Sequence, residues 1–270
     1  MKIFISVDME GIGGVVTERQ TDPEKGGPAY EESRRLMTGE TNAAIEGCLE
    51  AGAKEILVAD SHWNFTNLIA EQLHEAATLL SGQPRAWSMV EGLDATFDGA
   101  MFVGYHAMAG TPRAILDHTL TGRIRSVEVN GQPVGETGIN AYYAGHFGVP
   151  VVLVTGDRAV TQEAEALLPG VHTVAVKEAV SAESAKNLSP TRARDRIRLE
   201  ARKALEDREA IRPVTTATPV HVLIDFRETG HADVAAIVPG FHRKGGTTVA
   251  CEARDYVEAY RMIHAALLRY

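Results

Sequence analysis

The sequence has 270 residues, of which 44% are hydrophobic and 23% charged, a balance typical of a globular protein that buries a substantial core. Its formal net charge of −9 argues against a general nucleic-acid binder and against a protein held to membranes by basic residues, because both need a positive surface. The two cysteines cannot build a disulfide framework, no apolar run approaches the ~20 residues that span a bilayer, and the N-terminus lacks the features of a signal peptide. We therefore expect a cytoplasmic protein without membrane attachment.

The first 60 residues predict a parallel βαβ unit. Residues 3–7 form a short apolar run typical of a buried strand, and residues 30–51 carry a helical pattern with one apolar face. Residues 55–59 form a second buried run. A strand, a helix of about 20 residues and another strand imply parallel pairing with a right-handed crossover.

The following elements predict an α/β fold, a three-layer sandwich with a mostly parallel sheet, over residues 1–212. Further core strands are expected at 100–105, 150–154 and 171–176, with helices at 137–146, at 158–168 and from Ser189-Pro190 to about 207. Asn130-Gly131 predicts a tight hairpin turn between 124–129 and 132–134, because both residues tolerate positive φ.

The last part of the chain predicts a smaller, two-layer α/β region over residues 213–270. Its expected order is a strand at 222–226, a helix at 232–237, a strand at 247–252 and an amphipathic helix at 255–268. The segment 213–219 contains two prolines and is a plausible boundary. This region is either a small separate domain or an edge of the first one.

Polar side chains follow the predicted strands at the points where they end. These residues are Asp8 and Glu10 after the first strand, Asp60 and His62 after the second, His106 after the third, and Glu136 after the second arm of the hairpin. The carboxyl ends of parallel strands meet at one edge of a sheet, where ligand sites form. We therefore expect these side chains to converge.

Mixed carboxylate and imidazole groups suit zinc, and also manganese or iron. One catalytic zinc usually takes three protein ligands, so the five candidates other than Asp60 favour two metals that share a bridging carboxylate. Taken singly, each position has an ordinary alternative as a loop cap or a hydrogen-bonded core histidine. Asp60 could either orient the His62 imidazole or cap the loop that follows. Gly11, Gly13 and Gly14 lack dinucleotide-binding spacing and are expected to let the backbone pass close to the metals.

Seven short motifs occur along the chain in this order: SVDMEGI (6–12), DSH (60–62), SMVEGL (88–93), GYH (104–106), VGE (134–136), LSP (188–190) and GGTTV (245–249). This series resembles the D-aminopeptidase family of dinuclear zinc metallopeptidases, and the resemblance covers most of the chain. It implies an enzyme that releases N-terminal residues, D-amino acids in the type enzyme, from short peptides.

The resemblance also implies roles for individual residues. The ligands of two Zn²⁺ ions per subunit would be Asp8, Glu10, His62, His106 and Glu136, with Asp8 as the bridge. His118 would be the catalytic histidine, although the segment before it carries one residue more than the family pattern. The family forms five-fold symmetric decamers that enclose the active sites, so a homodecamer is expected.

Other interpretations stay open at this point. The chain could be a cytoplasmic peptide-binding component linked to dipeptide transport, or a different metal-dependent amidase on the same scaffold. The acids Glu91 or Asp94 could hold the ammonium group of a substrate, or could be solvated loop residues. The expected partners are short peptides and further copies of the chain, with no nucleic acid and no membrane.

Overall fold

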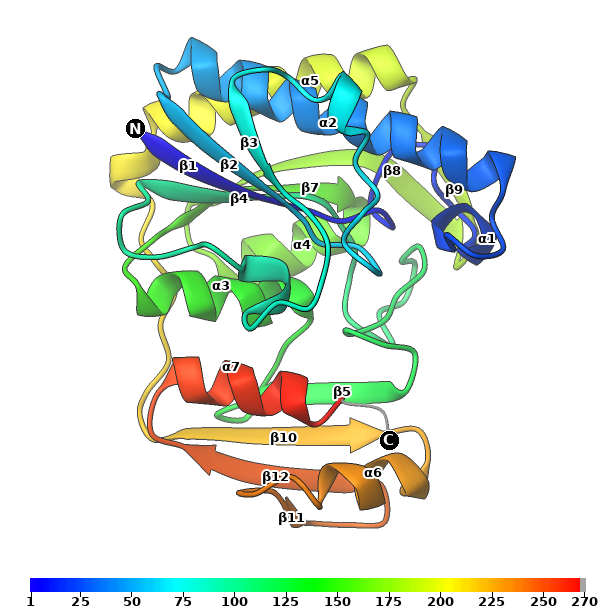
Figure 1. The fold of residues 1–270 in the computed structure, drawn as a ribbon, viewed down its shortest axis with the longest axis vertical. Helices are drawn as coiled ribbons and strands as arrows, with labels where there is room; N and C mark the ends of the chain where they lie inside the picture. Colours follow the sequence, from blue (N-terminus) through cyan, green and yellow to red (C-terminus); the bar gives the residue numbers. More distant parts are fainter. Residues whose placement is uncertain (268–270) are drawn as a thin grey trace.

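The computed structural model describes residues 1–267, and its larger sheet has seven strands in the order β3-β2-β1-β4-β7-β8-β9 (Figure 1). Every neighbouring pair is parallel except β8 and β9, which are antiparallel. The strands are β1 (Lys2–Val7), β2 (Glu55–Asp60), β3 (Ala77–Leu80), β4 (Gly99–Tyr105), β7 (Val151–Asp157), β8 (His172–Ser181) and β9 (Ser184–Asn187). The prediction of a mostly parallel sheet is confirmed.

Helices cover both faces of this sheet and complete the predicted three-layer sandwich (Figure 1). The helices α2 (Pro28–Glu50) and α5 (Pro190–Glu206) pack on one face, while α3 (Glu136–His146) and α4 (Arg158–Leu167) lie on the other. Short helices complete the connections: α1 (Glu18–Thr21), η1 (Ala70–Gln72), η2 (Ser88–Val90) and η3 (Arg208–Ala210).

The first strand shows why its sequence is apolar throughout. Ile3, Ile5 and Val7 belong to the core beneath α2 and α5, whereas Phe4 points into the core on the opposite face. A strand covered on both faces has no solvent-facing positions, so the alternation of polar and apolar residues disappears. The same physical cause produces the fully buried strands β4 and β7.

A second, antiparallel sheet lies beyond α3 and α7 (Tyr256–Ala265), and α6 (Thr229–Ala235) packs against its strands β10 and β12 (Figure 1). Its order is β11-β12-β10-β5-β6. The strands are β5 (Ile124–Val129), β6 (Gln132–Pro133), β10 (Val220–Phe226), β11 (His242–Arg243) and β12 (Thr248–Ala253). The hairpin prediction is confirmed, since Asn130 and Gly131 adopt φ of 49° and 79°.

The membership of this second sheet crosses the expected boundary. β5 and β6 precede residue 213 in the chain, yet β5 pairs with β10. The division of the chain at residue 213 therefore stays a prediction. Position 268, the expected end of the last helix, lies outside the described residues.

Two further features bear on the initial expectations. Cys48 and Cys251 are both buried and free. Over the described residues, none of the helices is long and apolar enough to cross a membrane.

Candidate metal centre

Three neighbouring strands of the larger sheet bring four of the five predicted ligands to one edge. Asp8 and Glu10 follow β1, His62 follows β2, and His106 follows β4, so all four lie beyond the carboxyl ends of parallel strands. All four side chains are buried. The prediction that these strand ends converge is correct for this group.

Glu136 reaches the same place from a different element. The second arm of the hairpin ends at Pro133 in the smaller sheet, and Glu136 is the first residue of α3. It therefore does not extend from the edge of the parallel sheet, as its position after a strand suggested. Helix α3 lies on the face of the larger sheet opposite α2 and α5, and its first residue directs this buried carboxylate at His106.

Asp8 lies between two pairs, each made of one carboxylate and one imidazole. Its Oδ1 is 3.2 Å from His62 Nδ1, and its Oδ2 is 3.4 Å from His106 Nε2. Glu10 Oε2 lies 3.0 Å from the same nitrogen of His62, and Glu136 Oε1 lies 3.2 Å from the same nitrogen of His106. The two oxygens of one carboxylate thus face two separate groups of donors.

Hydrogen bonds on the far side of each imidazole determine which nitrogen faces Asp8. His62 Nε2 donates to the carbonyl of Thr21 at 2.8 Å, and His106 Nδ1 donates to the carbonyl of Ala107 at 3.1 Å. The other two ring nitrogens, His62 Nδ1 and His106 Nε2, are therefore the ones that face the centre. Such backbone hydrogen bonds commonly orient metal-binding histidines.

The donor set fits divalent metal ions. In the described part of the chain, Glu10 Oε2 and His106 Nε2 are buried without a hydrogen-bond partner. Buried polar atoms are rarely left in this condition unless they serve a ligand. Asp8, Glu10 and His106 lie close enough to hold one ion, and so do His106, His118 and Glu136.

The charges in the centre also favour cations. Burial, together with the charge of Glu10, raises the pKa of Asp8 to about 7. Burial alone would lower the pKa of His62 and His106, but the neighbouring charges of Glu10 and Glu136 outweigh it and raise both values well above the usual range. Three buried carboxylates therefore attract positive charge, either as protons on the imidazoles or as metal ions.

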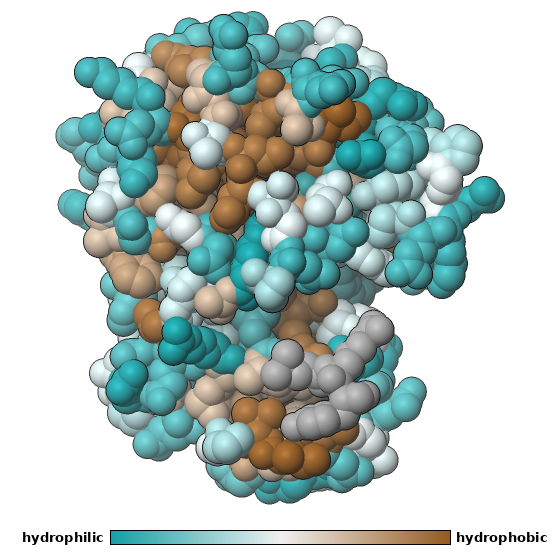
Figure 2. All heavy atoms as spheres, viewed as in Figure 1, coloured by the Kyte–Doolittle hydropathy of each residue, from teal (hydrophilic) through white to brown (hydrophobic). Residues whose placement is uncertain are grey.

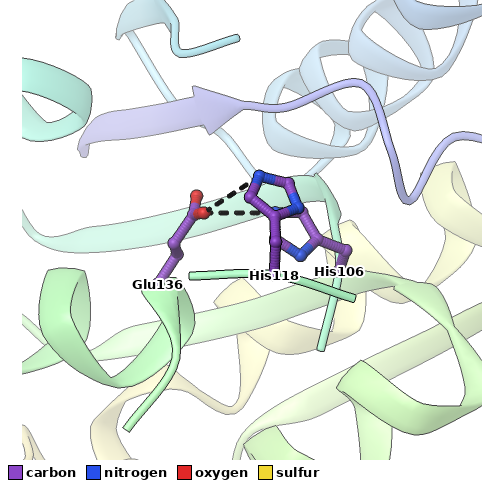
Figure 3. A group of neighbouring side chains, drawn as sticks. All are labelled: His106, His118 and Glu136. Carbon is purple, nitrogen blue, oxygen red and sulfur yellow. Dashed lines mark ion pairs between the residues drawn. The ribbon is translucent and has the colours of Figure 1, made fainter. Parts of the chain in front are cut away.

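His118 lies beside His106 and Glu136 (Figure 3) and is more exposed than the five predicted ligands. Its ring stacks on His106 with centroids 4.0 Å apart, and its Nε2 is 3.6 Å from Glu136 Oε1. Its Nδ1 donates to the carbonyl of Leu116 at 2.9 Å, and its side chain is 26% exposed. The loop that carries His118 is tied to the end of β7, because Asp157 Oδ2 accepts a hydrogen bond from the Ile115 N–H.

Asp60 fulfils the loop-capping alternative. Its carboxylate accepts hydrogen bonds from the backbone N–H groups of Asn67 and Leu68 at 2.5 and 2.7 Å. The Asn67 side chain in turn donates to the His62 carbonyl at 2.6 Å. Asp60 therefore shapes the turn that carries His62, and the Thr21 carbonyl, which gave no sequence signal, orients the ring.

Gly11 brings the backbone close to β4 rather than to the metal-binding groups. Its N–H donates to the Gly104 carbonyl at 2.8 Å, and a Cβ at this position would lie 1.9 Å from the carbonyl oxygen of Tyr105. Only glycine allows this approach. We expected Gly11 to let the backbone pass close to the metals; instead, it lets the backbone pass close to β4.

Two other acids have separate roles. Glu163 on α4 was missed from the sequence; it accepts a hydrogen bond from the Met108 N–H at 2.8 Å, just after His106, and burial raises its pKa to about 7. Glu91 accepts from the Trp87 N–H within its own loop, which agrees with the loop-acid alternative.

Known proteins resemble the chain over its whole length. A family model described as D-aminopeptidase matches residues 1–265. The D-aminopeptidase of Bacillus subtilis (strain 168) is 42% identical over 262 residues, which cover 97% of this chain and 94% of the relative. The solved structure of the Zn-dependent D-aminopeptidase DppA from Bacillus subtilis, a self-compartmentalizing protease, matches with a TM-score of 0.95 and 40% identity and covers 100% of this chain and 99% of its own. These relatives support the aminopeptidase interpretation and lend no support to the transport or amidase alternatives. The chain belongs to the D-aminopeptidase family.

Proposed function

We propose that this protein is a zinc-dependent D-aminopeptidase that hydrolyses the N-terminal peptide bond of short peptides. The observation that carries the proposal is the position of Asp8, whose two oxygens face His62 Nδ1 and His106 Nε2. A single carboxylate between two imidazole–carboxylate pairs suits a pair of metals that share a bridging ligand. The zinc dependence of the structurally similar DppA supports the choice of metal.

We assign two Zn²⁺ ions to each subunit. Glu10 and His62 would hold one ion, His106 and Glu136 would hold the other, and Asp8 would bridge them. Carboxylate oxygens and neutral imidazole nitrogens are ordinary zinc ligands. When bound, the two ions supply Lewis-acid polarisation of the scissile carbonyl and lower the pKa of water toward ~7.

His118 is assigned to proton transfer rather than to metal binding. Because its Nδ1 donates to the Leu116 carbonyl, its Nε2 is the nitrogen that can accept a proton and pass it to the leaving amine. Its side chain is 26% exposed, which supports a position beside the entering substrate, while the five assigned ligands are each at least 92% buried at the side chain. Burial of the ligands excludes bulk water and strengthens the electrostatic effects within the site.

We further propose that the subunits assemble into a homodecamer that encloses its active sites. The self-compartmentalizing character of DppA supports an oligomer, and the decamer rests on the family resemblance. Apolar residues gather over β2 and the edge strand β3 on the face shown in Figure 2, which suits a surface covered by another subunit. Enclosure would restrict access to short or unfolded peptides.

Paired substrates test the catalytic proposal. The purified protein is assayed on D-alanine amide and L-alanine amide before chelation, after chelation and after zinc is restored. We expect faster turnover of the D-substrate, loss of activity on chelation and recovery with zinc. Undiminished hydrolysis after exhaustive removal of metal would reject the metal mechanism, and faster turnover of the L-substrate would reject the proposed selectivity.

A further inference from the structure

The segment that carries two of the assigned ligands, residues 8–15, is here called the metal loop. It leaves β1 and is tied to β4 by two backbone hydrogen bonds, from the Asp8 N–H to the Val103 carbonyl and from the Gly11 N–H to the Gly104 carbonyl, each at 2.8 Å. Beyond Gly11, no backbone hydrogen bond among the described residues ties the loop to a strand, so side chains must fix the direction of its peptides.

A buried lysine from a distant strand supplies three of these contacts. Lys177 on β8 is only 3% exposed, and its Nζ donates to the backbone carbonyls of Glu10, Ile12 (2.9 Å) and Val15 (2.5 Å). An ammonium group has three hydrogens, so these carbonyls use its whole donor capacity. The pairing register of β7 and β8 shifts next to Lys177. Val176 and Lys177 are both buried although they are adjacent in one strand, where successive side chains would otherwise face opposite sides of the sheet.

A buried glutamate on helix α2 holds the same loop by accepting a hydrogen bond, whereas Lys177 donates hydrogen bonds to it. Glu40 on α2 is 3% exposed, and its Oε1 accepts a hydrogen bond from the Gly13 N–H at 2.9 Å. Lys177 therefore binds carbonyl groups of the loop and Glu40 binds an N–H group between them. Burial raises the pKa of Glu40 to about 7 and lowers the pKa of Lys177 to about 8, and the attraction between the two groups opposes both shifts.

We propose that Lys177 is a positioning residue of the metal centre, which together with Glu40 holds the metal loop so that the Glu10 carboxylate faces His62. The Glu10 carbonyl is bound to Lys177 while its side chain reaches His62 Nδ1 at 3.0 Å, so the lysine fixes the residue from behind. An apolar side chain could fill the same space without the cost of burying a charge. What the charge adds is direction, since it aligns three carbonyls toward one buried nitrogen. This inference rests on the proposed zinc function.

The test compares Lys177→Met with Lys186→Met. Lys186 lies on the adjacent strand β9, pairs in register with Glu178 and is exposed, so it provides a matched control. Zinc affinities of the metal-free proteins are measured by competition with a chromophoric chelator. In K177M we expect one of the two affinities to fall by about 10- to 100-fold, the range typical for partners behind metal ligands, while the other stays unchanged. K186M should bind both ions as the unaltered protein does.

A second comparison separates positioning from general weakening of the fold. In the Glu10→Ala background, K177M should have no further effect on the remaining zinc affinity, because the ligand that it positions is already gone. Equal loss at both zinc sites, or the same loss in the E10A background, would overturn the inference. So would unchanged binding in K177M.

The outcomes also distinguish the inference from the proposed function. If the unaltered protein binds no zinc, the proposed function fails; if it binds two ions and K177M binds them equally well, only the role of Lys177 fails. Should circular dichroism show that K177M does not fold, Glu40→Ala is titrated in its place. E40A must then show the same selective loss, and full binding at both sites would overturn the inference.

Discussion

Replacement of His118 by alanine tests the division between metal binding and proton transfer. The change removes an imidazole that stacks on His106 and whose Nε2 lies 3.6 Å from Glu136 Oε1. All five assigned ligands remain, so two zinc ions should stay bound. A positioned histidine typically contributes ~10²- to 10⁴-fold to the rate. We therefore expect kcat to fall by that factor, which corresponds to about 2.7–5.4 kcal/mol in activation free energy.

The fold should tolerate this change well. The side chain is 26% exposed, and its described hydrogen bond to a backbone group is the one to the Leu116 carbonyl. Loss of one hydrogen bond and one ring contact costs about 1–2 kcal/mol in the free energy of unfolding. His221→Ala is the matched control, because that histidine lies on β10 of the second sheet with 63% of its side chain exposed.

The assay combines steady-state kinetics on a D-amino-acid amide with zinc content by atomic absorption and molecular mass by light scattering. H118A should lose turnover but keep its zinc and its mass, and H221A should match the unaltered protein in all three. Turnover within about threefold of normal would refute a role for His118 in proton transfer. Loss of one zinc ion would instead make it a ligand.

Three further predictions concern the metals and the buried acids. Glu10→Ala or His106→Ala should each lower zinc content and abolish most turnover, and full zinc occupancy in either variant would remove that residue from the ligand set. Zinc binding should release protons, because the raised pKa values of His62 and His106 keep both imidazoles protonated in the metal-free protein at neutral pH; calorimetry in buffers of different ionisation enthalpy should show this release, and zinc affinity should rise with pH. The pKa of Glu163 is raised from 4.5 to about 7, so between these pH values the folded protein holds this proton and the unfolded chain does not. The stability that the proton gives to the metal-free protein is therefore fully present below pH 4.5 and is lost as the pH rises through 7. Relative to Glu163→Gln, the metal-free protein should therefore lose up to about 3 kcal/mol of unfolding free energy between pH 4.5 and pH 8, as urea denaturation at both pH values can measure, and a constant difference would contradict the assignment.

The elements predicted well are those with a strong local signal. β1, β2 and β4 are apolar because both faces of the parallel sheet are covered, and a polar residue at the end of each run indicated where a ligand site could form. Asn130-Gly131 predicted its hairpin because the turn itself requires positive φ.

The missed strands have no such signal. β3 and β9 are four-residue strands at the two edges of the sheet, and their mixed, partly exposed side chains show neither a continuous apolar run nor a clear alternation. Their structure comes from pairing with a neighbouring strand that is already in place, which sequence periodicity does not reveal.

Long-range contacts account for the features of the site that the sequence did not predict. Lys177 and Glu10 are 167 positions apart, and a lysine in a strand ordinarily indicates a solvent-facing position. The burial of Lys177 depends on three carbonyls that only the folded metal loop presents. Likewise, the sequence placed Glu136 near the centre, but its approach from the start of α3 follows from the second sheet, whose strands come from both parts of the chain.

Anomalous diffraction at the zinc edge from crystals of the purified protein tests the central proposal most directly. The account predicts two peaks in each subunit on either side of Asp8, one beside Glu10 and His62 and the other beside His106 and Glu136. A single peak in a fully zinc-loaded crystal, or two peaks that do not share Asp8, would contradict the bridged dinuclear centre.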